Sequence, residues 1–79
     1  MNTNLNRITL NSNVSNGKPS IRNMRFTVYQ MLELLASGMS HDEILDDYPY
    51  IEKEDISACL IYAAKITKTN MIIPLVDYA

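Results

Sequence analysis

The first thirty residues hold the side chains best suited to bind an anion. They contain no acidic residue and four basic ones, Arg7, Lys18, Arg22 and Arg25. The rest of the chain carries three lysines and nine acidic residues, so the net charge of −2 divides into +4 and −6. This asymmetry indicates that the N-terminal part meets an anion or the acidic part of a neighbouring chain, with a solvated basic hairpin as the alternative.

Two interpretations of these basic residues stay open. Lys18, Arg22 and Arg25, together with Arg7, lie around predicted turns and could contact the phosphates of double-stranded DNA. About four such contacts per chain, doubled in a dimer, would make the affinity fall steeply with salt. In the other interpretation, Arg22 and Arg25 pair with acidic residues of the second helix or of a partner chain.

The remaining reactive side chains do not form a catalytic or metal-binding set. The chain has one histidine, His41, predicted at the surface, and one cysteine, Cys59, predicted to be buried. Asp46 and Asp47 end a short predicted helix, and we interpret them as a solvated acidic end, with a partner contact as the alternative. Because no nucleophile, base and orienting residue can be combined, we predict a protein that is not an enzyme and has no metal, cofactor or small-molecule substrate.

The length of 79 residues fits one small domain. A core of this size supplies about 3–5 kcal/mol of net stability, and a single cysteine excludes an internal disulfide, so we predict a homodimer. Its expected seam is the N-terminal strands, and Tyr29 and Tyr50 are interface candidates, with core packing as the default for each. The sequence shows neither a signal peptide nor an apolar run of membrane-spanning length, and a cytoplasmic location is expected.

Turn residues predict a β-strand and turn segment over residues 7–28, preceded by a disordered N-terminus at residues 1–6. Short extended pieces are expected at 7–10, 20–21 and 26–28. Asn16 and Gly17 form a strong tight-turn pair. In the turn that follows Ile21, Asn23 is the best candidate for a positive φ angle.

A three-helix helix-turn-helix core is predicted over residues 28–68. The helix signals are the capping boxes Thr27–Gln30 and Ser40–Glu43, the C-cap Gly38 and the stop Pro49. The third helix is expected from Lys53 to Lys68. Residues predicted to face the core are Val28, Met31, Leu32, Leu35, Ile44, Leu45, Tyr48, Ile56, Cys59, Leu60, Ala63 and Ile66. Tyr48 and Tyr62 are predicted to line the junction of the second and third helices.

The outward face of the third helix is the part that a helix-turn-helix protein would present to DNA. It is predicted to carry Glu54, Ser57, Ile61, Lys65 and Lys68. Lys65 joins the candidate DNA contacts, but the helix begins with acidic residues and offers no Arg, Asn or Gln to a base edge. The pattern therefore favours the fold more than a DNA-reading surface.

Residues 69–79 form an apolar C-terminal tail. Its candidate partner-binding residues are Met71, Ile72, Ile73, Leu75 and Val76. Pro74 prevents a regular helix, so the tail is expected as an edge strand or an extended strap. We interpret it as a docking segment for a partner protein or a second subunit, with folding back onto the first and third helices as the alternative.

Several of these motifs occur in a known order. A basic turn, Gly17-Lys18-Pro19-Ser20-Ile21-Arg22, is followed by Leu34-Leu35 with Gly38, by Glu43-Ile44-Leu45 and by Tyr48-Pro49. From about Leu10 to Ala64 the chain resembles domain-of-unknown-function family 433, with Asn23-Met24 where the family carries Gly-Thr. The resemblance implies a homeodomain-like helix-turn-helix fold, and often the antitoxin half of a toxin–antitoxin pair with a ribonuclease-like toxin.

We therefore expect a mostly α fold: a three-helix, homeodomain-like helix-turn-helix domain with short N-terminal β-strands. The expected function is that of a small DNA-binding regulator of antitoxin type, which binds DNA as a dimer and holds a ribonuclease-like toxin through its tail. The alternative is a non-enzymatic protein-interaction module that has the same fold and does not bind DNA. The negative net charge and the apolar tail favour this alternative.

Overall fold

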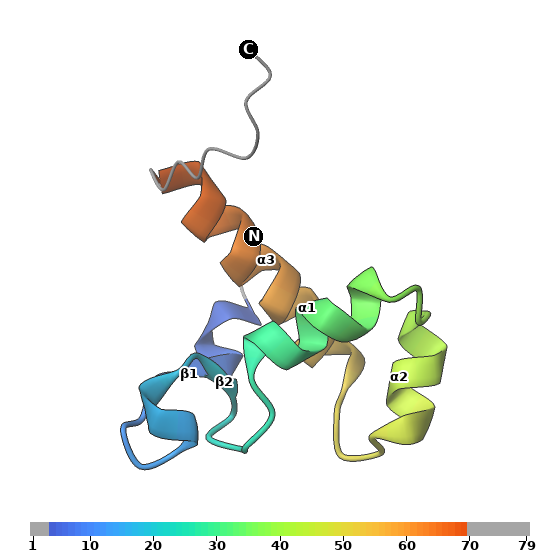
Figure 1. Ribbon diagram of the computed structural model, residues 1–79, viewed down its shortest axis with the longest axis horizontal. Coiled ribbons are helices and arrows are strands. Elements are labelled where there is room, and N and C mark those ends of the chain that lie inside the picture. The colour runs from blue at the N-terminus through green and yellow to red at the C-terminus, as the bar shows by residue number, and fades with distance from the viewer. Residues whose placement is uncertain (1–3, 70–79) are drawn as a thin grey trace.

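The computed structural model describes residues 4–69, which fold into three helices behind a short N-terminal hairpin (Figure 1). The elements in chain order are the 3-10 helix η1 (Asn4–Arg7), β1 (Ile8–Thr9), the 3-10 helix η2 (Ser15–Gly17), β2 (Ser20–Ile21), α1 (Val28–Ala36), α2 (His41–Asp47) and α3 (Lys53–Thr69). The mostly α, three-helix fold is confirmed, and α2 and α3 form a helix-turn-helix-like pair. Residues 4–6, predicted to be disordered, belong to η1.

The N-terminal segment is a two-stranded antiparallel hairpin with turns of left-handed backbone. Strand β1 pairs with β2 in the register Ile8–Ile21 and Thr9–Ser20, and the predicted strand over 7–10 is shorter than expected because Arg7 belongs to η1. After β2, Arg22 and Asn23 have φ angles of 45° and 59°. The positive φ predicted for Asn23 is therefore present, and Arg22 shares it. The backbone N–H of Met24 closes this turn by donating to the carbonyl of Ile21, and the N–H of Arg22 donates to the carbonyl of Arg7.

The helices begin and end where local sequence signals place them. Thr27 Oγ1 accepts the N–H of Gln30 at the start of α1. Ser40 and Glu43 form a reciprocal capping box at the start of α2, with distances of 2.8 and 3.1 Å. Gly38 has a φ of 100°, a left-handed conformation that suits glycine just after a helix. These short-range bonds fix the orientation at which α1 and α2 enter the core.

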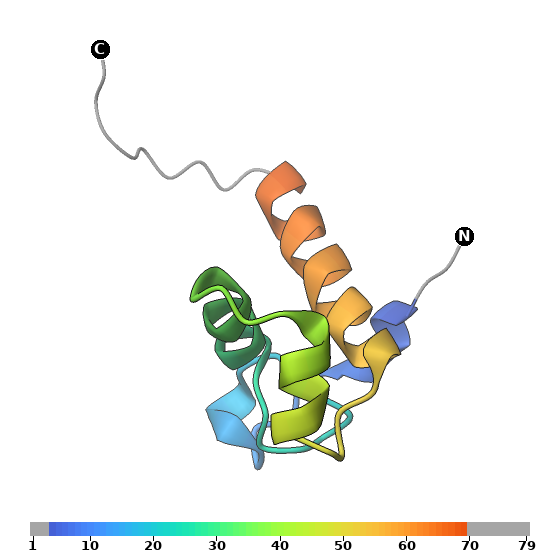
Figure 2. The same ribbon diagram turned by 90° about the vertical axis from the view of Figure 1, so that its right-hand side faces the viewer.

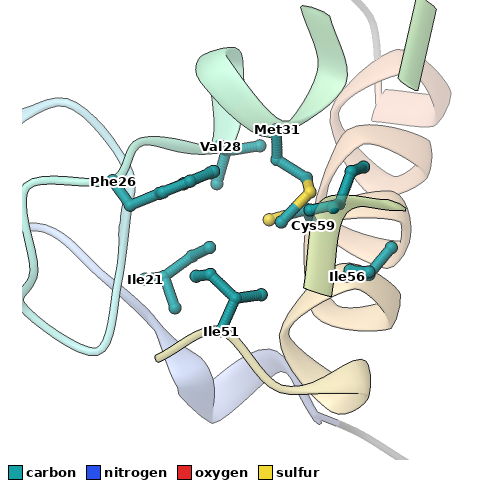
Figure 3. Close-up of a cluster of buried hydrophobic side chains, with 8 residues drawn as sticks. Ile21, Phe26, Val28, Met31, Ile51, Ile56 and Cys59 are labelled. Atoms are coloured by element: carbon teal, nitrogen blue, oxygen red, sulfur yellow. The ribbon is translucent and has the colours of Figure 1, made fainter. Parts of the chain in front are cut away.

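The core lies where the hairpin meets the three helices. Its buried apolar side chains are Ile21, Phe26, Val28, Met31, Ile44, Ile51, Ile56, Ala58 and Cys59. Figure 3 shows Phe26 and Ile21 from the N-terminal segment pointing toward Ile51 and the α3 side chains. Phe26 also packs edge-to-face on Tyr48, with 5.0 Å between ring centroids. The N-terminal segment is thus part of the core and not an appendage to it.

The buried face of α3 differs from the prediction. Leu60 and Ile66 were expected to face the core, but each is 42% exposed, whereas Asp55 and Ala58 are fully buried. The reason is that η1 packs on one side of the first half of α3 while α1 covers the other (Figure 2). The last turns of α3 extend past these neighbours (Figure 1). The buried face of α3 therefore depends on packing against η1 and α1, which the periodicity of the α3 sequence alone cannot predict.

Candidate functional site

The most connected polar group of the described chain is the carboxylate of Asp55. It lies in the first turn of α3 and its side chain is fully buried. Arg22 binds it in bidentate fashion, with Nε 3.1 Å from Oδ1 and Nη2 2.7 Å from Oδ2. Arg7 Nη1 lies 2.9 Å from Oδ1, and the backbone N–H of Glu52 donates to Oδ2 at 2.8 Å. We call Arg7, Arg22, Glu52 and Asp55 the Asp55 cluster.

The Asp55 cluster joins four parts of the chain. Arg7 comes from η1, Arg22 from the turn after β2, and Glu52 immediately precedes α3. Arg7 Nη1 also binds Glu52 Oε1 at 2.8 Å, and Arg22 Nη2 donates to the carbonyl of Tyr50 at 3.0 Å. Every hydrogen bond to the Asp55 carboxylate is charge-assisted, and the bidentate Arg22 pair adds directional specificity. The cluster therefore fastens the hairpin and η1 to the start of α3.

Burial and hydrogen bonding act in opposite directions on Asp55. Burial disfavours the charged carboxylate and raises its pKa, but hydrogen bonds from Arg22, from the Glu52 N–H and from Arg7 outweigh it, so the pKa lies below its ordinary value of 3.8. Hydrogen bonds to Glu52 and Asp55 raise the pKa of Arg7, and a hydrogen bond to Asp55 raises that of Arg22. All three side chains are therefore charged at neutral pH.

A second feature is an apolar groove between α1 and the C-terminal half of α3, which we call the α1–α3 groove. Its volume is about 680 Å³, and it is open to solvent. The lining residues are Lys18, Pro19, Thr27, Val28, Tyr29, Leu32, Tyr62, Ala63, Ile66 and Thr67. Lys18 is the one charged side chain among these ten. The groove's lining residues come from α1, α3 and the segment before α1, and η1 packs on the other side of α3 from α1 (Figure 2).

The rim of the α1–α3 groove is made by aromatic and aliphatic side chains that are exposed. Tyr29 on α1 is 66% exposed, and Ile66 on α3 is 42% exposed. Leu32 and Tyr62 form half-buried walls that also contact the core. The sequence assigned Leu32 and Ile66 to the core and Tyr62 to the α2–α3 junction. All three line this groove, but Leu32 also packs against the core, as predicted, whereas Ile66 is exposed.

A family model described as a protein of unknown function, DUF433, matches residues 8–63. The chain belongs to this family. Searches of curated proteins and of solved structures gave no match. The DUF433 match includes the hairpin, α1, α2 and α3 as far as Ala63, and therefore contains Arg22 and Asp55 together with most of the groove wall.

The predicted DNA contacts lie in different environments of the described chain. Arg7 and Arg22 are bound to the Asp55 cluster. Lys18 is exposed and lines the α1–α3 groove. Arg25 is exposed and forms no ion pair with any side chain between residues 5 and 68, and Lys65 is exposed on α3.

The predicted ion-pair alternative was correct for Arg22 but named the wrong acids. It placed them on the second helix or on a partner chain, whereas the acids belong to the start of α3. For Arg25 it finds no support within residues 5–68. The acidic residues Glu52, Glu54 and Asp55 at the start of α3 were the signal that could have pointed to intramolecular partners for these arginines.

The other reactive residues of the DUF433 domain lie apart from one another. His41 is exposed, as predicted, and so are Asp46 and Asp47 at the end of α2. Cys59 is buried in the core, which raises the pKa of its thiol to about 12 and keeps it protonated. Among residues 4–69, no group of three His, Cys, Asp or Glu side chains could hold a metal ion. None of the helices in that range is long and apolar enough to cross a membrane.

The predicted partner-binding residues follow the DUF433 match and α3. Met71, Ile72, Ile73, Leu75 and Val76 lie outside the residues that the structure describes. Of the tyrosines assigned to an interface, Tyr29 and Tyr50 are exposed by 66% and 54%. Tyr29 borders the α1–α3 groove, and Tyr50 lies against Tyr48 at a centroid distance of 6.3 Å.

Proposed function

We propose that this DUF433 domain is a non-enzymatic protein-interaction module, working in the cytoplasm, that binds an apolar segment of another protein in the α1–α3 groove. The groove is the single observation that carries the proposal. Its walls are apolar, and its rim carries Tyr29, an amphipathic aromatic of the kind enriched in protein interfaces. Half-buried Leu32 and Tyr62 offer a partner further apolar surface that is rigidly attached to the core.

The electrostatics of α3 support an interaction module without DNA binding. In a helix-turn-helix protein the N-terminal residues of the second helix contact the bases. Here Glu52 and Glu54 are exposed at that position and would repel phosphate. Arg7 and Arg22, half of the basic residues of the N-terminal segment, are used to hold Asp55. The fold thus retains the helix pair while half of the positive charge of the N-terminal segment serves internal pairing.

A second candidate is the DNA-binding regulator of antitoxin type suggested by the family resemblance. The exposure of Lys18 and Arg25 favours it, because both are available to contact phosphate. Such a regulator would bind double-stranded DNA as a homodimer and hold a ribonuclease-like toxin. The two candidates share one expectation, since a toxin with an apolar segment would also fit the groove of an interaction module.

The groove can be tested by photo-crosslinking in the cells that produce the protein. Replacing Tyr29 with a photoreactive benzoyl-phenylalanine is expected to give a covalent adduct with one protein, and the same residue at exposed Ser57 is expected to give none. Ile66→Glu should reduce the adduct roughly tenfold or more, as expected for an interface residue worth over 1 kcal/mol. Leu60→Glu is the matched control, because Leu60 is equally exposed on α3 and lies outside the groove.

Three outcomes would contradict the proposal. They are an adduct of equal yield at Tyr29 and Ser57, an adduct insensitive to Ile66→Glu, and crosslinking to DNA in place of protein.

A further inference from the structure

The α1–α3 groove extends to the last turn of α3. Ile66 and Thr67 form part of its wall, and the described chain ends two residues later, at Thr69. A segment that follows Thr69 therefore starts beside the open end of the groove. The segment from Asn70 to Ala79 is covalently attached at this end of the groove, so it could bind the groove without an encounter with a second molecule.

The composition of this segment matches the groove. Between Asn70 and Ala79, five large aliphatic or thioether side chains surround Pro74, and Asp77 is the single charged residue. The groove is apolar apart from two threonines, two tyrosine hydroxyls and one charged side chain, the exposed Lys18. An apolar strap with one acidic residue near its far end thus meets an apolar groove with one basic residue.

The dimensions agree with a strap that runs back along α3. From Thr69 to Tyr62 the helix axis covers about 10 Å, at 1.5 Å per residue. Seven extended residues, Met71 to Asp77, span about 23 Å. The strap is therefore long enough to pass Tyr62 and bring Asp77 beyond it, toward the Lys18 and Pro19 side of the groove. Pro74 is compatible with this path, because walls made of helix side chains offer no strand ladder that its missing N–H would have to join.

We infer that residues 71–77 occupy the α1–α3 groove of their own chain as an extended strap, with the apolar side chains against Leu32 and Tyr62 and the Asp77 carboxylate at the Lys18 amine. The regulatory consequence rests on the function proposed above: a partner segment must displace this strap. The protein then presents its groove only to partners that bind it more tightly than the chain's own tail does.

Zero-length carbodiimide crosslinking of the full wild-type chain, followed by peptide mass spectrometry, tests the inference. The reagent joins a lysine amine to a carboxylate only when the two are in contact. At low protein concentration and without any partner, the expected product is an amide between Lys18 and Asp77 within one chain. Asp77→Asn should abolish the product, and so should Lys18→Arg, which keeps the positive charge and cannot form the amide.

Lys65 and Lys68 provide an internal control, because both are much closer to Asp77 in the sequence. A tail that is not seated in the groove would crosslink to these lysines in preference to Lys18, and that result would overturn the inference. A Lys18–Asp77 product found only between two chains would also overturn it, since the occupant would then be the tail of a second copy. The carbodiimide experiment contains no partner protein. A negative result would therefore reject the strap without deciding whether the groove binds a partner, which the photo-crosslinking experiment tests separately.

Discussion

Replacing Asp55 with alanine is expected to lower the free energy of unfolding by about 3–5 kcal/mol, the cost typical of breaking a buried ion pair. The substitution removes four hydrogen bonds to one carboxylate. It also leaves the Glu52 N–H without its acceptor, and it leaves Arg7 with only Glu52 and Arg22 with only the Tyr50 carbonyl as hydrogen-bond acceptors. Since a domain of this size has only a few kcal/mol of net stability, this loss is comparable to its entire free energy of unfolding. Urea unfolding followed by circular dichroism measures it.

The same experiment has a matched control and a milder variant. Glu54→Ala removes the neighbouring acid of α3, which is exposed, and should change stability by less than about 0.5 kcal/mol. Asp55→Asn keeps the shape of the side chain and removes the charge, so it remains measurable if the alanine variant does not fold. Equal effects of Asp55→Asn and Glu54→Ala would contradict a structural role for the Asp55 cluster.

The pH dependence of this difference follows from the pKa of Asp55. Because the pKa in the folded state lies below the ordinary value of 3.8, the ionised carboxylate stabilises the fold at pH values above that value. This contribution is lost as the pH falls through the folded-state pKa. The stability difference between the wild-type protein and Asp55→Asn should therefore be full at neutral pH and shrink below about pH 4.

Arg22→Ala is expected to cost about 2–3 kcal/mol, whereas Arg25→Ala should stay within about 0.5 kcal/mol. Arg22 makes three hydrogen bonds, two to the fully buried Asp55 and one to the Tyr50 carbonyl. Arg25 is exposed and has no ion-pair partner among residues 5–68. The positive φ of 45° at Arg22 does not bias this comparison, because alanine and arginine have a similar conformational energy cost at that φ angle.

A conservative variant sharpens the test of Arg22. Arg22→Lys keeps the charge but replaces a planar bidentate donor with a point charge, so an intermediate loss of stability is expected. Thermal unfolding of the three variants under identical conditions is the measurement. If Arg22→Ala and Arg25→Ala lowered the stability by the same small amount, the two arginines would be equivalent surface charges. That result would contradict a structural role for Arg22.

The parts of the fold that depend on neighbouring residues were predictable. Ser40 and Glu43 are three residues apart, and their capping box forms as the pattern indicates. Gly38 and Asn23 also take the positive φ angles that their residue types favour. In each case the interaction that decides the conformation lies within a few positions of the residue, so no knowledge of the remaining chain is needed.

The candidate sites depended on contacts across the chain and were predicted less well. Asp55 is buried because Arg22 and Arg7, 33 and 48 residues away in the sequence, both reach it. A pattern that sorts residues by polarity places an aspartate at the surface and an apolar residue such as Leu60 in the core, and the structure reverses both. The groove was missed for a related reason: an apolar residue such as Leu32 or Ile66 suits both a core and a groove wall, and the packing of α1 against α3 decides between them.

The central claim is that the basic N-terminal segment supports the fold of a protein-interaction module and does not serve DNA binding. The most direct test is a titration of the full chain with a DNA duplex from its own upstream region, at about 50 to 200 mM salt. The account predicts no binding tighter than about 10⁻⁴–10⁻⁶ M, the range of non-specific contacts, and none that distinguishes this duplex from an unrelated one. Tight binding to the upstream duplex with a log–log salt slope of about −4 or steeper would contradict it, since two exposed basic residues on each chain of a dimer would produce that slope. The loss of such a slope in Lys18→Ala with Arg25→Ala would then assign the DNA contacts to these two residues.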